Sequence, residues 1–219
     1  MEHNTTHYFN ARVRDEIWSW PGDVLADYAW VIDAVTRFGI EPWIPRLRRA
    51  TWGVTRARLS GDGVSAQVFL CAPEPGRVLV VLAHSEQAGC GGGYAELERM
   101  ASRRMRTYHL PRSGYHPVAH DQAAFTCAAR GKPGFCLALE SLADEYLIAR
   151  ECVRRRRDSG LTQLEVAWAM GTTDSAISRL EHARGLSPSL ATVRRYARAI
   201  GCELEMRVVP RSDGAPEKG

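Results

Sequence analysis

A group of polar side chains between residues 173 and 179 has the types and spacing needed to hydrogen-bond to nucleic-acid bases. If this stretch is helical, one outer face carries Asp174, Ser175, Ser178 and Arg179. Short hydroxyl and carboxylate side chains can meet base edges in the major groove, and an arginine can hold a guanine through two hydrogen bonds. The pattern therefore predicts a helix that can read double-stranded DNA.

The flanking sequence predicts how such a helix is held. Thr162 and Glu165 form a T-x-x-E capping box at the start of a preceding helix, and Gly171 suits the left-handed residue of a short turn. Thr173 can cap the second helix. The faces expected to pack together carry Val166, Ala167 and Met170 in the first helix, and Ile177 and Leu180 in the second. A helix, a tight turn and a second helix make a helix-turn-helix.

The length of the chain allows one large domain or two small ones. The 219 residues are 45% hydrophobic and 25% charged, which are ordinary values for a globular protein. The net charge of +4 is concentrated towards the C-terminus, because residues 150–207 hold 11 arginines against 7 acidic residues, whereas residues 1–110 hold 13 against 12. A basic C-terminal part is what nucleic-acid binding requires.

The sequence shows no sign of export or of membrane insertion. It has no run of about 18 apolar residues, and its first ten residues, MEHNTTHYFN, lack a hydrophobic signal core. The six cysteines include no C-x-x-C pair, so reduced thiols are expected. A zinc site could be drawn from four side chains, but their spacing fits no well-defined pattern: His116, His120, Cys127 and Cys136. We expect a cytoplasmic protein without a metal or other cofactor.

Residues 1–109 are expected to form one α+β domain. Helical periodicity predicts two helices over residues 11–38, the second capped by Asp23. A basic helix over residues 94–108 is expected to complete the domain. Between them the short turns favour an antiparallel meander. Its three strand-like runs are residues 52–58, 64–70 and 78–83.

The second half of the chain is predicted to be mainly helical. Residues 110–136 show no clear periodicity and are expected to be a linker. A helix over residues 137–157 leads into the helix-turn-helix and a further helix follows it, while alternation over residues 203–209 predicts a short terminal strand. The expected second domain is residues 137–209, followed by a disordered tail over residues 210–219.

Residues 160–181 read GLTQLEVAWAMGTTDSAISRLE, and residues 187–201 read SPSLATVRRYARAIG. Together they closely resemble the phage-repressor (XRE-type) helix-turn-helix family. The ending RYARAIGCELEMRVV is more specifically similar to HigA-type antitoxins, in which such a domain finishes in a short strand. The resemblance implies that Asp174, Ser175 and Arg179 face base edges. It also implies phosphate contacts from Gln163 and Arg184, whereas Ser178 is equally well explained as a solvent-facing residue.

The N-terminal part contains EIWSWPGDVLADYAWVIDAVTRFG, the runs QVFLC and VLVVLA, and ERMASRRM. These resemble, more weakly, RelE/HigB-type toxins, which are ribosome-associated mRNA endonucleases. Toxin and antitoxin are normally encoded by separate neighbouring genes. The two resemblances therefore imply a fused HigBA-like pair in toxin-then-antitoxin order, with the ribosome and its mRNA as possible partners of the first domain.

The implied nuclease chemistry needs cations that hold the scissile phosphate and an acid or base that works near neutral pH. The paired lysines of the toxin family are replaced here by the segment His84-Ser85-Glu86-Gln87-Ala88, and the whole chain has only two lysines. The side chains left for these roles are Arg56, Arg58, His84 and Arg103. We expect an attenuated or inactive nuclease, and the sequence leaves open whether enzymatic activity remains.

Two further features allow more than one interpretation. Leu164 and Trp168 lie off the buried face of their helix, so they either pack on the preceding helix or dock the first domain or a second subunit. Residues 154–157 are four consecutive arginines. They form either a solvated helix end, favoured by the helix dipole, or a set of phosphate contacts.

The sequence as a whole predicts a fused toxin–antitoxin protein whose second domain binds operator DNA as an autorepressor. A homodimer on an inverted repeat is expected, because a single recognition helix contacts few base pairs. Linkage in one chain would keep the second domain beside the first, so that neutralisation would be intramolecular. The alternatives are an active ribosome-dependent mRNA endonuclease held in check in cis, and a regulator whose first domain only binds a ligand or partner.

Overall fold

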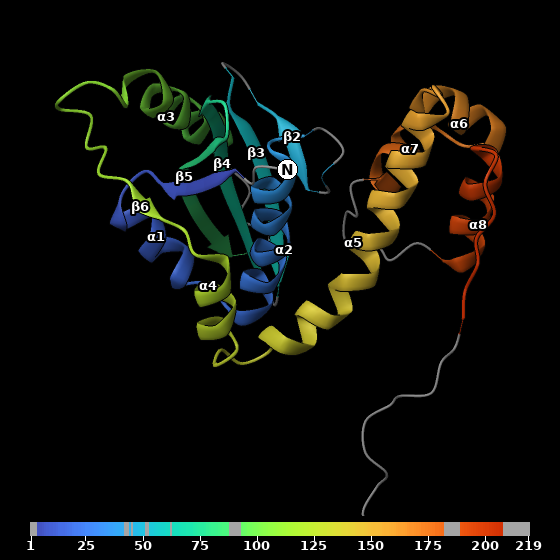
Figure 1. Ribbon diagram of the computed structural model, residues 1–219, viewed down its shortest axis with the longest axis horizontal. Coiled ribbons are helices and arrows are strands. Elements are labelled where there is room, and N and C mark those ends of the chain that lie inside the picture. The colour runs from blue at the N-terminus through green and yellow to red at the C-terminus, as the bar shows by residue number, and fades with distance from the viewer. Residues whose placement is uncertain are drawn as a thin grey trace, which may run out of the picture.

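A computed structural model describes residues 4–41, 44, 46–50, 53–61, 63–87, 93–181 and 189–207. Two units stand side by side in it, joined by the long helix α5 (Phe135–Asp158). The N-terminal unit, from strand β1 to helix α4, is built of a sheet and helices. The C-terminal unit, from the second half of α5 onwards, is helical (Figure 1). The expected division into an α+β part and a helical part is confirmed.

The N-terminal unit is built on a mixed sheet with the strand order β2-β3-β4-β5-β1-β6. Its three long strands form the expected antiparallel meander. The first strand, which the sequence analysis missed, runs parallel to β5, and β6 pairs antiparallel with β1. The strands are β1 (Thr5–Tyr8), β2 (Leu47–Arg49), β3 (Thr55–Gly61), β4 (Val64–Glu74), β5 (Arg77–Gln87) and β6 (Val118–Ala119).

Helices cover both faces of this sheet. The two predicted helices at the start of the chain are present as α1 (Ala11–Trp18) and α2 (Gly22–Phe38), and the basic helix is α3 (Tyr94–Thr107). Asn10 caps α1 by accepting a hydrogen bond from the Val13 amide. Figure 1 shows α2 on one side of the strands and α3 on the other. The sheet is therefore buried on both faces, which explains why β4 and β5 are nearly continuous runs of apolar residues.

The segment 110–136, expected to be a linker, is instead part of the N-terminal unit. It contributes β6 and helix α4 (Gln122–Ala129), which Asp121 caps by accepting a hydrogen bond from the Ala124 amide. Phe125 and Ala129 are buried in the same core as the sheet. Strand β6 and helix α4 are too short to show a clear periodicity in the sequence, and turns separate their apolar residues.

Helix α5 starts two residues before its expected position and enters both cores. We call Asp27, Trp30, Arg46 and Tyr146 the α5 anchor. The Tyr146 hydroxyl donates to Asp27 Oδ1 at 2.6 Å, and Arg46 Nε donates to the same oxygen at 3.1 Å. Trp30 stacks on the Tyr146 ring and donates its indole N–H to the Leu139 carbonyl. Burial first of all, together with the nearby Asp27, raises the pKa of Tyr146 well above its ordinary value.

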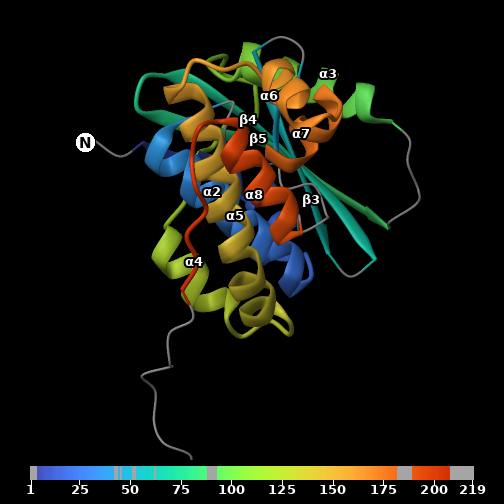
Figure 2. The same ribbon diagram turned by 90° about the vertical axis from the view of Figure 1, so that its right-hand side faces the viewer.

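The C-terminal unit holds three shorter helices, which are α6 (Gln163–Met170), α7 (Asp174–Glu181) and α8 (Leu190–Ala199). Figure 2 shows them gathered around the second half of α5. The terminal strand expected over residues 203–209 is not formed by residues 203–207, and the rest of that prediction and the tail lie outside the described residues. Alternating apolar residues make a strand only beside a partner strand, which the described part of this unit does not offer. No helix of the described ranges is long and apolar enough to cross a membrane.

A partly buried chain of hydrogen bonds fixes β6 and α4 against the first strand. The Tyr8 hydroxyl lies 2.6 Å from His120 Nδ1, and His120 Nε2 lies 2.8 Å from Gln122 Oε1. The Gln122 amide nitrogen donates to the Ala29 carbonyl, so the Gln122 oxygen is free to accept from Nε2–H of His120. The imidazole is then neutral, and its Nδ1 accepts from the Tyr8 hydroxyl. Burial lowers the pKa of His120 and raises that of Tyr8 to about 12. His120 is thus a structural residue rather than a metal ligand.

We expect acidification to destabilise the N-terminal unit through His120. The pKa of His120 in the folded protein lies below its ordinary value of 6.5. The stability that the neutral imidazole contributes is therefore fully present above the pKa of the unfolded chain, and it is lost as the pH falls through the folded pKa. Urea unfolding, followed by tryptophan fluorescence at about pH 7.5 and about pH 5.5, should show a smaller loss of stability in His120→Gln than in the natural chain. Equal losses in the two proteins would contradict this assignment.

Candidate nucleic-acid interface

The helix-turn-helix forms with the local signals that the sequence provides. The Thr162 hydroxyl accepts from the Glu165 amide, and the Glu165 carboxylate accepts from the Thr162 amide at 2.7 Å, which completes the capping box. Gly171 ends α6 with φ at 60°, a left-handed conformation that glycine adopts without strain. The Thr173 hydroxyl accepts from the Ala176 amide and so caps α7. All three predictions are confirmed.

The two helices of the motif pack on α5 and α8 through a small apolar core. Val166, Ala167 and Ile177 are almost wholly buried, as the sequence predicts, and Leu180 is partly buried. They meet Val193 and other side chains of α8. Ser189 caps α8 through the Thr192 amide. The core fixes the angle between α6 and α7, and hence the direction in which the outer face of α7 points.

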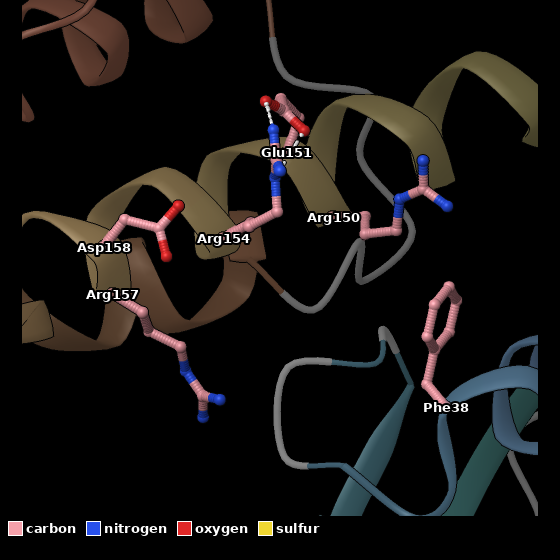
Figure 3. A pocket seen from close by; sticks show the side chains of 6 residues that line it. All are labelled: Phe38, Arg150, Glu151, Arg154, Arg157 and Asp158. Carbon is pink, nitrogen blue, oxygen red and sulfur yellow. Dashed lines mark hydrogen bonds and ion pairs between the residues drawn. The ribbon is translucent and has the colours of Figure 1, made fainter. Parts of the chain in front are cut away.

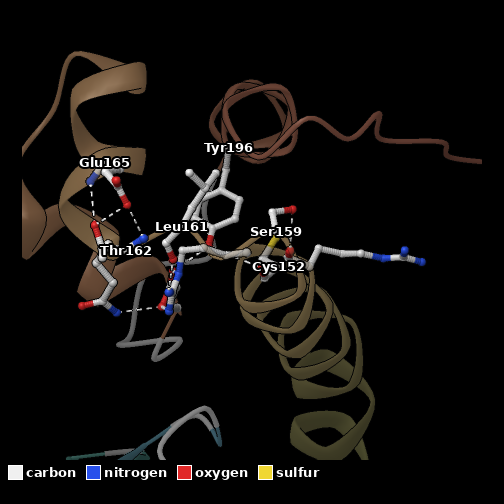
Figure 4. Close-up of polar contacts among 10 residues, drawn as sticks. Cys152, Ser159, Leu161, Thr162, Glu165 and Tyr196 are labelled. Carbon is white, nitrogen blue, oxygen red and sulfur yellow. Dashed lines mark hydrogen bonds and ion pairs between the residues drawn. The ribbon is translucent and has the colours of Figure 1, made fainter.

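A buried carboxylate holds the end of α7 to the rest of this unit. We call Arg156, Gln163, Glu181 and Tyr196 the Glu181 network. Arg156 Nε and Nη2 lie 2.6 and 2.9 Å from the two carboxylate oxygens of Glu181, which is 2% exposed. The Tyr196 hydroxyl donates to Glu181 at 2.5 Å and the Gln163 amide at 2.7 Å. Figure 4 shows Tyr196 of this network in the same region as the Thr162–Glu165 cap.

The Glu181 network satisfies its buried charges completely. Burial alone would raise the pKa of Glu181, but the hydrogen bonds from Arg156, Tyr196 and Gln163 hold it below its ordinary value. Burial and the nearby carboxylate raise the pKa of Tyr196, so its hydroxyl remains a donor. Arg156 also donates to the Leu161 carbonyl, at the loop before α6. One ionised pair thus ties α5, α6, α7 and α8 together.

The residues expected to contact DNA are placed in three ways. Four of them are exposed on α7 or at its cap: Thr173, Asp174, Ser175 and Arg179. Ser178 is half-buried, and its hydroxyl accepts a hydrogen bond from Arg48 Nη2 of strand β2 at 3.0 Å. Gln163 is half-buried and its amide is directed at Glu181, while Arg184 lies outside the described residues. The structure therefore gathers most of the predicted side chains on one face of α7.

The four consecutive arginines at the end of α5 comprise three exposed side chains and one buried side chain. Arg154 and Arg155 share Glu151 in exposed ion pairs at 2.7 and 2.8 Å. Arg157 is exposed, whereas Arg156 belongs to the Glu181 network. The pairing of Arg156 was not expected from the sequence, although a signal was present. Arg156 lies three residues after the buried Val153, on the apolar stripe of α5.

Leu164 and Trp168 of α6 are exposed side chains. They are 46% and 70% exposed, so much of the surface of both side chains is left uncovered. The exposure of Trp168 speaks against full packing on the preceding helix or on the N-terminal unit. An exposed apolar pair on an otherwise polar helix is the kind of surface that meets another molecule.

Three of the four candidate catalytic residues share one face of the sheet. Arg58 is opposite Gln67 on the neighbouring strand, and Gln67 is opposite His84 on the next. Arg56 lies two residues before Arg58 and so points to the same face. Arg103 is not part of this group, because it is exposed on α3, whose next residue Arg104 turns to the sheet and donates to the Val81 carbonyl.

Acidic groups occupy the same sheet face and weaken its capacity to hold phosphate. Arg56 Nη1 pairs with Glu98 Oε1 of α3 at 3.1 Å and lies over the Tyr94 ring. The Tyr94 hydroxyl donates to Glu86 at 2.8 Å, which raises the pKa of Tyr94. The Gln67 side-chain oxygen is buried without a hydrogen-bond partner. Tyr94 and Glu98 were not expected at this face from the sequence, because they reach it only through the packing of α3 on the sheet.

A metal centre finds no support in the described residues, where no three His, Cys, Asp or Glu side chains come together. Of the four zinc candidates in the sequence, His120 is held by Tyr8 and Gln122, and Cys127 and Cys136 are exposed.

We expect the Glu181 network to be essential for the C-terminal unit. Glu181→Ala leaves the buried guanidinium of Arg156 without its partner and should lower the free energy of unfolding by about 3–5 kcal/mol. The double change Arg156→Met/Glu181→Leu removes both charges and should cost much less, because no buried charge is left unpaired. Chemical unfolding of the three proteins measures the difference. Equal destabilisation of the single and double variants would contradict the assignment.

Comparison with known families agrees with this geometry. The helix-turn-helix family model matches residues 153–206, from the last turns of α5 to the segment after α8. No curated protein and no solved structure matches the chain. Residues 153–206 are therefore a helix-turn-helix domain, and this supports a DNA-binding transcriptional regulator.

Proposed function

We propose that the protein is a transcriptional regulator that reads operator DNA through α7. The observation that carries the proposal is the exposed polar face of this helix. Asp174, Ser175 and Arg179 stand on it, and the Thr162–Glu165 cap and the buried Glu181 network hold the two ends of the helix-turn-helix in place. An α-helix with such a face fits the major groove, where Arg179 can hold a guanine and the shorter side chains can reach neighbouring bases.

We further propose that two copies bind an inverted repeat and that the chain represses its own synthesis. One recognition helix contacts only a few base pairs, so a single domain gains little specificity over non-specific DNA. Two-fold pairing doubles the number of base contacts and sets the spacing of the half-sites. Arg157, exposed at the end of α5, is a candidate for the non-specific attraction to phosphates that accompanies such binding.

For the N-terminal unit we propose an attenuated RelE/HigB-like toxin domain, joined to a HigA-like partner in one chain. The order of two helices, an antiparallel meander and a last helix supports this origin. The α5 anchor supports intramolecular neutralisation, because Tyr146 and Leu139 bring the antitoxin-like part directly onto α2. The ion pair of Arg56 with Glu98, and the missing lysines, support attenuation.

The proposed recognition of DNA by α7 can be tested by the substitution of one arginine. Arg179→Ala should weaken binding to a duplex selected from a random pool by about 1–3 kcal/mol and relax the preference at one base pair. Arg198, exposed on α8, provides a matched control, and Arg198→Ala should keep the preference. Fluorescence anisotropy on the selected duplex and its single-base variants measures both effects. Retained affinity and selectivity in Arg179→Ala would contradict the proposal.

A second candidate function, an mRNA endonuclease silenced in cis, is favoured by the approach of Arg58 and His84 on either side of Gln67. The fragment that tests it should end at residue 134, before α5, because Leu139 and Tyr146 of the antitoxin-like part contact α2. We expect no growth arrest when this fragment is induced, provided that it is soluble and folded. Arrest by the fragment that is relieved in Arg56→Ala/Arg58→Ala/His84→Ala, and absent with the full chain, would establish the nuclease instead.

A further inference from the structure

A hydrogen bond between the two units falls on the proposed DNA-reading face. Arg48 belongs to β2, at the edge of the sheet, and its Nη2 donates to Ser178 Oγ of α7 at 3.0 Å. The two residues are separated by 130 positions in the chain. In Figure 1, α7 lies on the side of the C-terminal unit that faces β2. The recognition helix is therefore in contact with the N-terminal unit of the same chain.

Ser178 shares the face of α7 that the proposed function assigns to DNA. It follows Asp174 by four residues and Ser175 by three, and such residues lie one above the other on a helix. Asp174 and Ser175 are exposed, while Ser178 is half-buried. We propose that strand β2 and duplex DNA compete for this face of α7. The inference rests on the proposed function, since it names an intramolecular partner for the same site.

The dimensions of the DNA major groove decide whether β2 and DNA can contact α7 at the same time. The major groove is about 12 Å wide, and an α-helix with its side chains is about 10–12 Å across. An inserted recognition helix therefore fills the groove, with base edges against its outer face. The Arg48 guanidinium bonded to Ser178 takes up space that base edges or the groove wall would need, and strand β2 follows within the length of one side chain. Consequently, β2 has to withdraw before α7 can enter.

The remaining boundary between the units is suited to such a withdrawal. A cavity of about 570 Å³ separates the end of α2 from the second half of α5, with Phe38 on one side and Arg150, Arg154 and Arg157 on the other. Figure 3 shows the Phe38 ring directed towards α5, and Arg157 extending from the helix. Charged side chains around a cavity hold two bodies together less firmly than a packed apolar interface.

The α5 anchor limits how the units can separate. Tyr146 fixes the first half of α5 to the N-terminal unit, whereas Cys152 belongs to the core of the C-terminal unit. The opening motion is therefore either a bend in α5 between these residues or a shift of the β2 edge. In both cases the Arg48–Ser178 contact must break, so this contact lowers the fraction of molecules that can bind DNA.

Removal of the Arg48 guanidinium tests the competition in the full chain. Duplexes are selected from a random pool with the natural protein and with Arg48→Ala in parallel, and both proteins are then titrated on the same duplex. Arg48→Ala should bind about three- to tenfold more tightly, the change in equilibrium that the loss of one hydrogen bond produces. Arg48→Gln provides a second variant that keeps most of the side chain and should also bind more tightly.

Arg49→Ala is the matched control, because Arg49 is exposed on the same strand and the substitution removes the same charge. Its affinity should equal that of the natural protein. The slope of log K against log salt concentration should also be unchanged in Arg48→Ala. Weaker binding by Arg48→Ala with a slope reduced by about 1 would overturn the proposal and make Arg48 a phosphate contact. Equal affinities would overturn it too. Failure of every protein to bind any duplex would instead refute the proposed function.

Discussion

One helix that is shared by two hydrophobic cores sets the arrangement of the whole molecule. The first half of α5 is fixed by Tyr146, whose hydroxyl meets the buried Asp27 and whose ring stacks on Trp30. The second half supplies Cys152 and Arg156 to the core of the C-terminal unit. A continuous helix transmits orientation because bending it breaks backbone hydrogen bonds. The position of α7 relative to the sheet is therefore determined by how α5 is anchored, and DNA recognition is coupled to the fold of the N-terminal unit.

The C-terminal unit meets a different requirement, which is to present α7 without distortion. Its apolar core is small, so polar interactions carry much of the specificity of packing. Glu181 receives hydrogen bonds from Arg156, Gln163 and Tyr196, which come from α5, α6 and α8. A half-satisfied network of this kind would be worse than an apolar core, so all its members have to be in place together. The network leaves the outer face of α7 polar and open, apart from the contact at Ser178.

Local signals were enough to predict the helix-turn-helix, because the Thr162–Glu165 cap and Gly171 act within a few residues. The same was true of α1, α2 and the meander, which have clear periodicities. The short elements in residues 110–136 could not be predicted, because β6 is defined only by its pairing with β1, and α4 by the burial of Phe125. At the site, the exposed residues of α7 were predictable. The contact of Ser178 with Arg48 was not, since nothing local in the sequence links positions 130 residues apart.

The most direct measurement of the central claim is the distance between the two units with and without DNA. Nitroxide labels would be placed at Arg49 on β2 and at Ala169 on α6, both exposed, in a chain whose Cys90, Cys127, Cys136 and Cys202 are replaced by serine. Double electron–electron resonance should give one short distance in the free protein. A saturating amount of the selected duplex should shift this distance to longer values, because β2 has to leave α7. An unchanged distance in a complex shown to contain DNA would contradict the account.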